Sequence, residues 1–70
     1  MAVAKVRDIL KMLRRDGWWL DRQEGSHRQF RHAVKLGTVT VAGKESVILP
    51  HDTVSSILRQ AGLTKEDLKK

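Results

Sequence analysis

The stretch WWLDRQEGSHRQFRHAVKLGTVTV, residues 18–41, decides the fold, because short apolar or β-branched runs alternate in it with turn residues. Residues 18–23 begin with aromatic and apolar side chains and end with polar ones, which favours a strand. The Glu24-Gly25-Ser26 segment has the composition of a turn. We therefore expect residues 27–34 to form a second strand, paired with the first as a hairpin.

A third strand follows the hairpin. Leu36-Gly37 predicts another turn, and residues 38–41 alternate threonine with valine, which is the period of a strand with one buried face. Three strands in a row, each joined by a short turn, predict an antiparallel meander. Such a sheet is stable if one of its faces is covered.

A helix is expected before the sheet. In residues 3–15 the apolar side chains recur at spacings of three, four and seven, and Gly17 follows as a helix stop. The segment is basic and amphipathic, so two roles are open to it: packing on its own domain, or lying on a membrane surface. The modest width of its apolar stripe favours packing.

A second helix is expected after the sheet. Residues 42–49 are a connection of no predicted form, and Pro50 suits the first turn of a helix. An apolar stripe runs on to Gly62, which predicts the C-terminal stop. Thr64 and Asp67 are spaced to cap a short final turn.

The predicted fold class is α+β, a two-layer sandwich in α-β-β-β-α order with two helices on one face of a three-stranded antiparallel sheet. Seventy residues, 40% of them apolar, predict a single domain spanning residues 1–70. The sequence contains no cysteine and no long apolar run. These two features predict a cytoplasmic protein without a transmembrane segment.

Strand alternation sorts the side chains of the sheet. Phe30, the sole phenylalanine, should face the helices, which places His27, Gln29 and Arg31 on the open face. The same alternation puts Trp18 and Leu20 inward on the first strand. It puts the following side chains outward: Trp19, Asp21, Gln23, Thr38 and Thr40. Such a face suits RNA, because an indole stacks on unpaired bases, although an ordinary solvated strand has a similar composition.

The net charge and the absence of several catalytic motifs limit the classes of function that are open to this protein. Fourteen Lys and Arg against eight Asp and Glu give a net charge of +6, which attracts RNA, DNA or an acidic protein. The sequence has no P-loop, dinucleotide fingerprint or nucleophile elbow. Its three histidines are not spaced to converge on a metal, so we expect no metal and no cofactor.

RNA cleavage needs little more than an imidazole. The ribose 2′-hydroxyl is a built-in nucleophile, and an imidazole, which titrates close to neutral pH, can remove its proton or protonate the leaving oxygen. Arg28 or Arg31 next to His27 would stabilise the charge on phosphorus. A lone strand histidine is also compatible with a purely structural role.

Four segments, in order, resemble the HicA family of mRNA interferase toxins. They are Asp16-Gly17-Trp18, then Gly25-Ser26-His27-Arg28-Gln29-Phe30-Arg31-His32, then Val39-Thr40-Val41-Ala42-Gly43-Lys44, and Ser56-Ile57-Leu58-Arg59-Gln60-Ala61-Gly62-Leu63. Together with the leading helix, the resemblance covers nearly the whole chain. It implies a fold like that of double-stranded-RNA-binding domains, in the order given above.

The resemblance also implies a function and a site. It predicts ribosome-independent cleavage of mRNA, with the histidine of the Gly-Ser-His motif, His27, as the catalytic residue. It predicts positioning roles for Gly25 and Ser26, and neutralisation by an acidic antitoxin of the HicB type. The expected RNA contacts are Arg28, Gln29, Arg31 and Lys44.

Two alternatives remain at this level. The first is an RNA-binding module without catalysis; the start of the second helix, residues 50–56, weakens it, because it has no Lys or Arg for phosphate. The second is an adaptor domain whose basic surface binds an acidic protein.

Overall fold

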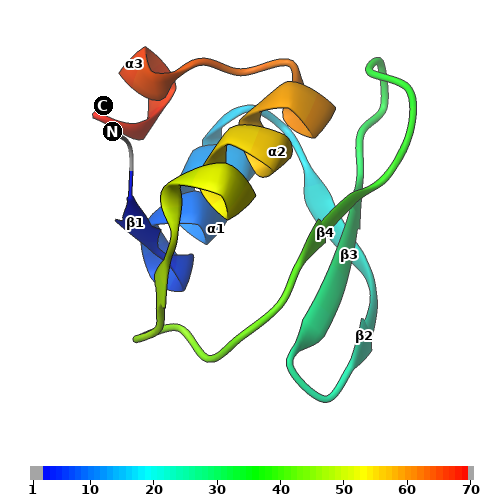
Figure 1. Ribbon diagram of the computed structural model, residues 1–70. Coiled ribbons are helices and arrows are strands. Elements are labelled where there is room, and N and C mark those ends of the chain that lie inside the picture. Colours follow the sequence, from blue (N-terminus) through cyan, green and yellow to red (C-terminus); the bar gives the residue numbers. More distant parts are fainter. Residues whose placement is uncertain (1–2, 70) are drawn as a thin grey trace.

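A computed structural model describes residues 3–69 of the chain. Its elements, in chain order, are β1 (Ala4–Lys5), α1 (Val6–Arg15), β2 (Trp19–Glu24), β3 (His27–Arg31), β4 (Val39–Val41), β5 (Ile48–Leu49), α2 (His51–Ala61) and α3 (Lys65–Leu68). Strands β2, β3 and β4 form an antiparallel sheet in that order. Helices α1 and α2 lie side by side on one face of it (Figure 1). The predicted two-layer α+β sandwich is confirmed.

Both long helices end as the sequence predicts. Gly17 and Gly62 follow α1 and α2 with φ of 98° and 66°, values that favour glycine. The N–H of Trp18 donates to the Leu13 carbonyl at 3.0 Å, and that of Leu63 donates to the Leu58 carbonyl at 2.9 Å. This is the hydrogen-bond pattern of a Schellman motif, which satisfies the last carbonyls of each helix.

The predicted cap of the final turn is also present. The Asp67 carboxylate accepts a hydrogen bond from the Thr64 N–H at 2.8 Å and starts the four-residue α3. Pro50 lies one residue before the first turn of α2, at the N-cap. This position suits proline, which has no N–H to donate.

The predicted first helix begins three residues too early. Ala4 and Lys5 are instead a short strand that pairs with β5, a strand that the sequence does not predict. The N–H groups of Val6 and Arg7 then donate to the carbonyls of Val47 and Glu45, at 2.9 and 3.1 Å. The connection before α2 therefore takes the place of a side-chain cap at the start of α1.

One core joins the two layers. Phe30 is 1% exposed and Trp18 2%, so the inward positions predicted for these two residues are correct. The apolar side chains of α1 are buried in the same core, which leaves no apolar stripe for a membrane surface. Within residues 3–69 no helix has the length and apolar character required to cross a membrane.

Candidate active site

The turn between β2 and β3 places His27 at the start of β3. Glu24 and His27 are cross-strand partners, so Gly25 and Ser26 form a two-residue hairpin loop. Gly25 has φ of 56°, whereas no residue other than glycine has a positive φ in the described part of the chain. A positive φ at only the first loop residue fits a type II′ turn. Gly25 is thus required by backbone conformation, since a Cβ there would meet no neighbouring atom within 4 Å.

His27 lies in a hollow on the sheet face that the helices leave open. The hollow has a volume of about 260 Å³. Its lining residues are Arg22, Glu24, His27, Gln29, Thr40 and Ala42. Strand pairing explains the set, because Arg22 is opposite Gln29 and Gln29 is opposite Thr40, and directly opposed side chains share a face.

A β-bulge in β2 changes which side chains of that strand lie on the open face, so part of the prediction for this face needs correction. The pairing of β2 with β3 shifts between Leu20 and Arg22, so Asp21 has no cross-strand partner. Beyond the bulge the alternation is reversed, as one extra residue exchanges the two faces. The outward prediction for Gln23, which pairs with Arg28, is therefore wrong, and Arg22 and Glu24 instead lie on the open face beside His27. No glycine marks the bulge, so the sequence offers no signal for it.

The His27 ring is free to react. Its side chain is exposed, and no hydrogen bond or ion pair within residues 3–69 involves it. Glu24, its cross-strand partner, brings a carboxylate to the same hollow. An imidazole and a carboxylate facing one small space are the residue types that general acid–base catalysis uses.

His32, by contrast, is held by the fold. Its Nδ1 accepts the N–H groups of Val34 and Lys35, both at 3.0 Å, and its Nε2 lies 2.7 Å from the Asp16 carbonyl oxygen. The two bonds to Nδ1 require that the proton is on Nε2, which donates to Asp16. The ring also meets Trp18 edge to face, with centroids 5.1 Å apart. Of His27 and His32, only His27 has nitrogens available to a ligand.

The predicted RNA-contact residues divide between the two faces. Gln29 and Arg31 share the open face with His27, and the Arg31 guanidinium has no hydrogen-bond partner among the described residues. Arg28 pairs with Val41 on the core side, and its Nη1 donates to the Gly43 carbonyl at 2.8 Å. Lys44 is exposed in the connection after β4.

The connection that carries Lys44 is tied to the histidine turn. The Gly43 N–H donates to the Ser26 carbonyl at 3.3 Å. Together with the Arg28 bond to Gly43, this contact brings Lys44 to the same end of the sheet as His27. The structure thus joins the Gly-Ser-His motif to the Ala-Gly-Lys segment, which lies 15 or more residues further along the chain.

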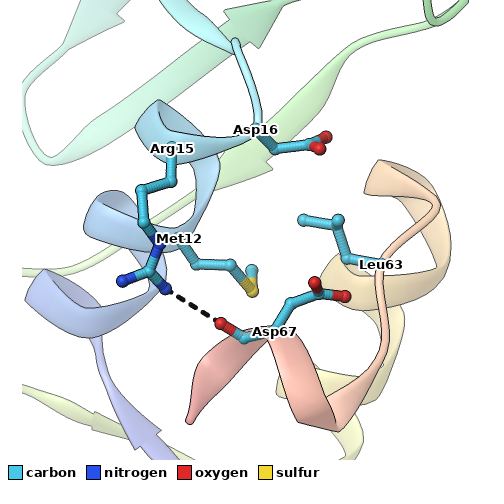
Figure 2. A pocket seen from close by; sticks show the side chains of 5 residues that line it. All are labelled: Met12, Arg15, Asp16, Leu63 and Asp67. Atoms are coloured by element: carbon cyan, nitrogen blue, oxygen red, sulfur yellow. Dashed lines mark hydrogen bonds between the residues drawn. The ribbon is translucent and has the colours of Figure 1, made fainter. Parts of the chain in front are cut away.

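A second hollow lies between α1 and α3, away from the open face. It is lined by Met12, Arg15, Asp16, Leu63 and Asp67, and Figure 2 shows Arg15 reaching from α1 to the Asp67 carbonyl, at 2.9 Å. Its Asp16 carboxylate is held by Lys35 at 2.6 Å and by the Trp18 indole N–H at 3.1 Å. These groups join helices to the sheet, so we assign this hollow to the architecture.

The histidines do not converge. His27 lies on the open face, His32 packs against Trp18, and His51 begins α2. In the part of the chain that the structure describes, no three His, Cys, Asp or Glu side chains gather as metal ligands would.

The fold and this surface define a basic sandwich domain with an unobstructed histidine on an open sheet face. In a comparison with protein families, the model of the HicA toxin of bacterial toxin–antitoxin systems matches residues 6–63. The chain therefore belongs to the HicA toxin family. It is the toxin of a toxin–antitoxin system, and an antitoxin is its expected partner. A search of curated proteins gave no significant match.

Proposed function

We propose that this toxin is a ribosome-independent RNA endonuclease, an mRNA interferase, in which His27 is the general acid or base. The observation that carries the proposal is the unbonded His27 ring in a hollow that also holds a guanidinium and a carboxylate. Membership of the HicA toxin family supports it. The site of action would be the cytoplasm, where mRNA is found.

The reaction needs only groups that RNA and this hollow supply. The ribose 2′-oxygen attacks the adjacent phosphorus while its proton passes to a base, and the bond from phosphorus to the 5′-oxygen breaks as that oxygen receives a proton from an acid. The products are a 2′,3′-cyclic phosphate and a 5′-hydroxyl. His27 takes one of the two proton-transfer roles. Glu24, the carboxylate across the strand pair, is placed to assist in the other.

Cations on the open face hold the substrate. Arg22 lines the same hollow as His27 and is therefore our candidate to stabilise the negative charge that develops on phosphorus. Arg31 and Lys44 extend the contacts to flanking phosphates, and Gln29 donates from its amide. Arg28 was expected to join them, but its bond to Gly43 supports a different role, that of holding the Lys44 segment in place.

The Gly-Ser turn positions the catalytic ring. Gly25 provides the left-handed backbone conformation, and the Ser26 carbonyl receives the Gly43 N–H. Both residues therefore fix where β3 begins and where the His27 ring projects. We assign positioning roles to them and no part in proton transfer.

Binding of RNA without cleavage is the second candidate. The uncovered face and its cations favour RNA binding in either case, so the two candidates differ only in the role of His27. At the start of α2, where double-stranded-RNA-binding domains place basic residues, the turn holds Asp52 and no Lys or Arg. That difference favours the catalytic proposal, in which the open sheet face is the RNA surface.

The test uses purified toxin, single-stranded RNA and matching DNA. We expect wild type to cut RNA with and without EDTA, to leave DNA intact because it lacks the 2′-hydroxyl, and to yield cyclic phosphate ends. His27→Ala should fold, bind RNA and not cut it. Cleavage by folded His27→Ala would refute the assignment of His27, and loss of wild-type cleavage in EDTA would refute the metal-free mechanism. Binding by wild type without cleavage would establish the second candidate.

A further inference from the structure

Trp19 has an exposed indole that is not part of the buried core. It follows the buried Trp18 and is 48% exposed, although tryptophan is highly buried on average. Its ring takes part in no hydrogen bond or ring contact among the described residues. A single exposed apolar side chain is common on protein surfaces, so a binding role for Trp19 requires two further features, a polar neighbour and a path for a ligand.

Strand pairing gives Trp19 both. Trp19 is directly opposite Arg31, so the indole and the guanidinium share one face. This is the open face of His27, because His27 and Arg31 are four residues apart on β3 and thus have the same parity. At the rise of an antiparallel strand the two positions are roughly 13 Å apart.

The surface between them suits a polyanion. Arg22 and Gln29 lie between the Trp19–Arg31 pair and the Glu24–His27 pair. A strand of RNA that follows this face meets cations along its backbone, and at the far end an aromatic ring next to a guanidinium. Both of those groups stack on the faces of unpaired bases.

We propose that Trp19 and Arg31 form a nucleobase-binding subsite, which holds an unpaired base of single-stranded RNA at a position removed from the bond that is cut. This subsite rests on the proposed RNA-cleaving function and adds the substrate class to it. A base inside a duplex is covered by its neighbours and cannot lie on the indole. The subsite therefore selects single-stranded RNA over double-stranded RNA.

The test measures RNA binding in a His27→Ala background, so that no substrate is lost. A short single-stranded oligoribonucleotide and its blunt duplex are titrated against Trp19→Leu, Trp19→Phe and Leu20→Ala. Leu20 is the matched control, because it is the next residue of β2 and 47% exposed but is paired with Phe30 on the other face.

Loss of base stacking should weaken binding of the single strand roughly 5- to 100-fold in Trp19→Leu. Trp19→Phe should retain most of the affinity, Leu20→Ala should retain all of it, and the duplex should bind Trp19→Leu and its parent equally. Equal affinity of Trp19→Leu and its parent for the single strand would overturn the subsite. So would an equal loss for single strand and duplex, or absence of single-strand binding by the parent.

The outcome is separable from that of the cleavage assay. If wild type does not cut RNA but single-strand binding depends on Trp19, the subsite stands and the catalytic proposal fails. If wild type cuts RNA and Trp19→Leu cuts and binds it equally well, the catalytic proposal stands and the subsite fails.

Discussion

A Cβ atom on Gly17 would lie 3.0 Å from Nε2 of His32. The two residues are in contact because the His32 ring reaches across to donate to the carbonyl of Asp16, the residue before Gly17. The Asp16 carboxylate also accepts a hydrogen bond from Lys35 Nζ, which donates a second one to the Ala61 carbonyl at the end of α2. His32 therefore packs and bonds with the Asp16-Gly17-Trp18 segment. This set of contacts is structural and is separate from the hollow that contains His27.

Gly17→Ala should destabilise the fold more than the same change at Gly62. Both glycines have left-handed φ, which costs an L-residue about 1–2 kcal/mol. At Gly17 the methyl group also presses on the His32 ring, whereas at Gly62 the nearest atom, Lys35 Nζ, is 3.7 Å away, which is an ordinary van der Waals contact. Thermal unfolding followed by circular dichroism measures the difference. Equal losses at the two sites would show that His32 moves aside at no cost.

Substitutions of His27 and His32 should have opposite phenotypes. His32→Ala leaves two backbone N–H groups and the Asp16 carbonyl without their partner, so stability should fall by about 2 kcal/mol or more. His32→Asn should recover part of this loss, because its side-chain oxygen can replace Nδ1 as acceptor. His27→Ala removes an exposed ring and should change stability by about 0.5 kcal/mol at most.

In RNA cleavage, the two histidine variants should show the reverse pattern, with His27→Ala more strongly affected than His32→Ala. At a temperature where His32→Ala is folded, it should cut RNA at nearly the wild-type rate, whereas His27→Ala should not cut it. Denaturant titration and a gel assay on the same preparations provide both measurements. An inactive but fully folded His32→Ala would place His32 in the reaction and contradict the assignment of its ring to the fold.

The sequence predicts the sandwich because its signals are local. Periodicity marks α1 and α2, glycines mark their ends, and alternation places Phe30 and Trp18 in the core. Strand β5 could not be predicted, because a two-residue strand is too short to show an alternating pattern. It is defined only by its pairing with β1. Leu20 lies on the core side opposite Phe30 but remains half-exposed, because β2 is an edge strand of the sheet.

The candidate site is predicted less completely for a related reason. His27, Gln29 and Arg31 follow from the parity of β3, which is regular. Arg22 and Glu24 could not be found, because the bulge at Asp21 is a property of how two strands pair and has no composition of its own. The tie of Arg28 to Gly43 is likewise a tertiary contact that alternation does not reveal.

The bulge leads to a prediction about two arginines. Arg22→Ala should weaken RNA binding, and the dependence of log affinity on log salt should lose about one unit of slope, as for one phosphate contact. Its stability should be unchanged, because the Arg22 side chain has no partner among the described residues. Binding titrations at several salt concentrations make the measurement.

Arg28→Ala is the matched control, since it removes the same charge from the neighbouring region of the sheet. It should lower stability by about 1 kcal/mol through the lost bond to Gly43. The salt slope should stay as in wild type, because the bond from the Gly43 N–H to the Ser26 carbonyl still ties the Lys44 segment to the turn. If Arg28→Ala reduces the slope and Arg22→Ala does not, then RNA is bound next to Arg28 and the open sheet face is not the RNA surface.

The antitoxin should bind over the open face. An acidic antitoxin gains most where cations are unpaired and the surface is uncovered, and there it also blocks the approach of RNA to His27. We expect fast association that slows with added salt, because opposite charges steer the encounter. In the complex, RNA cleavage should stop and His27 should be protected from modification by diethyl pyrocarbonate.

Two charge reversals test the location: Arg31→Glu on the open face should weaken the complex, whereas Arg14→Glu on α1, which changes the net charge equally, should have little effect. A stronger loss with Arg14→Glu, or a complex that still cuts RNA, would place the antitoxin on the helical layer and require inhibition at a distance from His27.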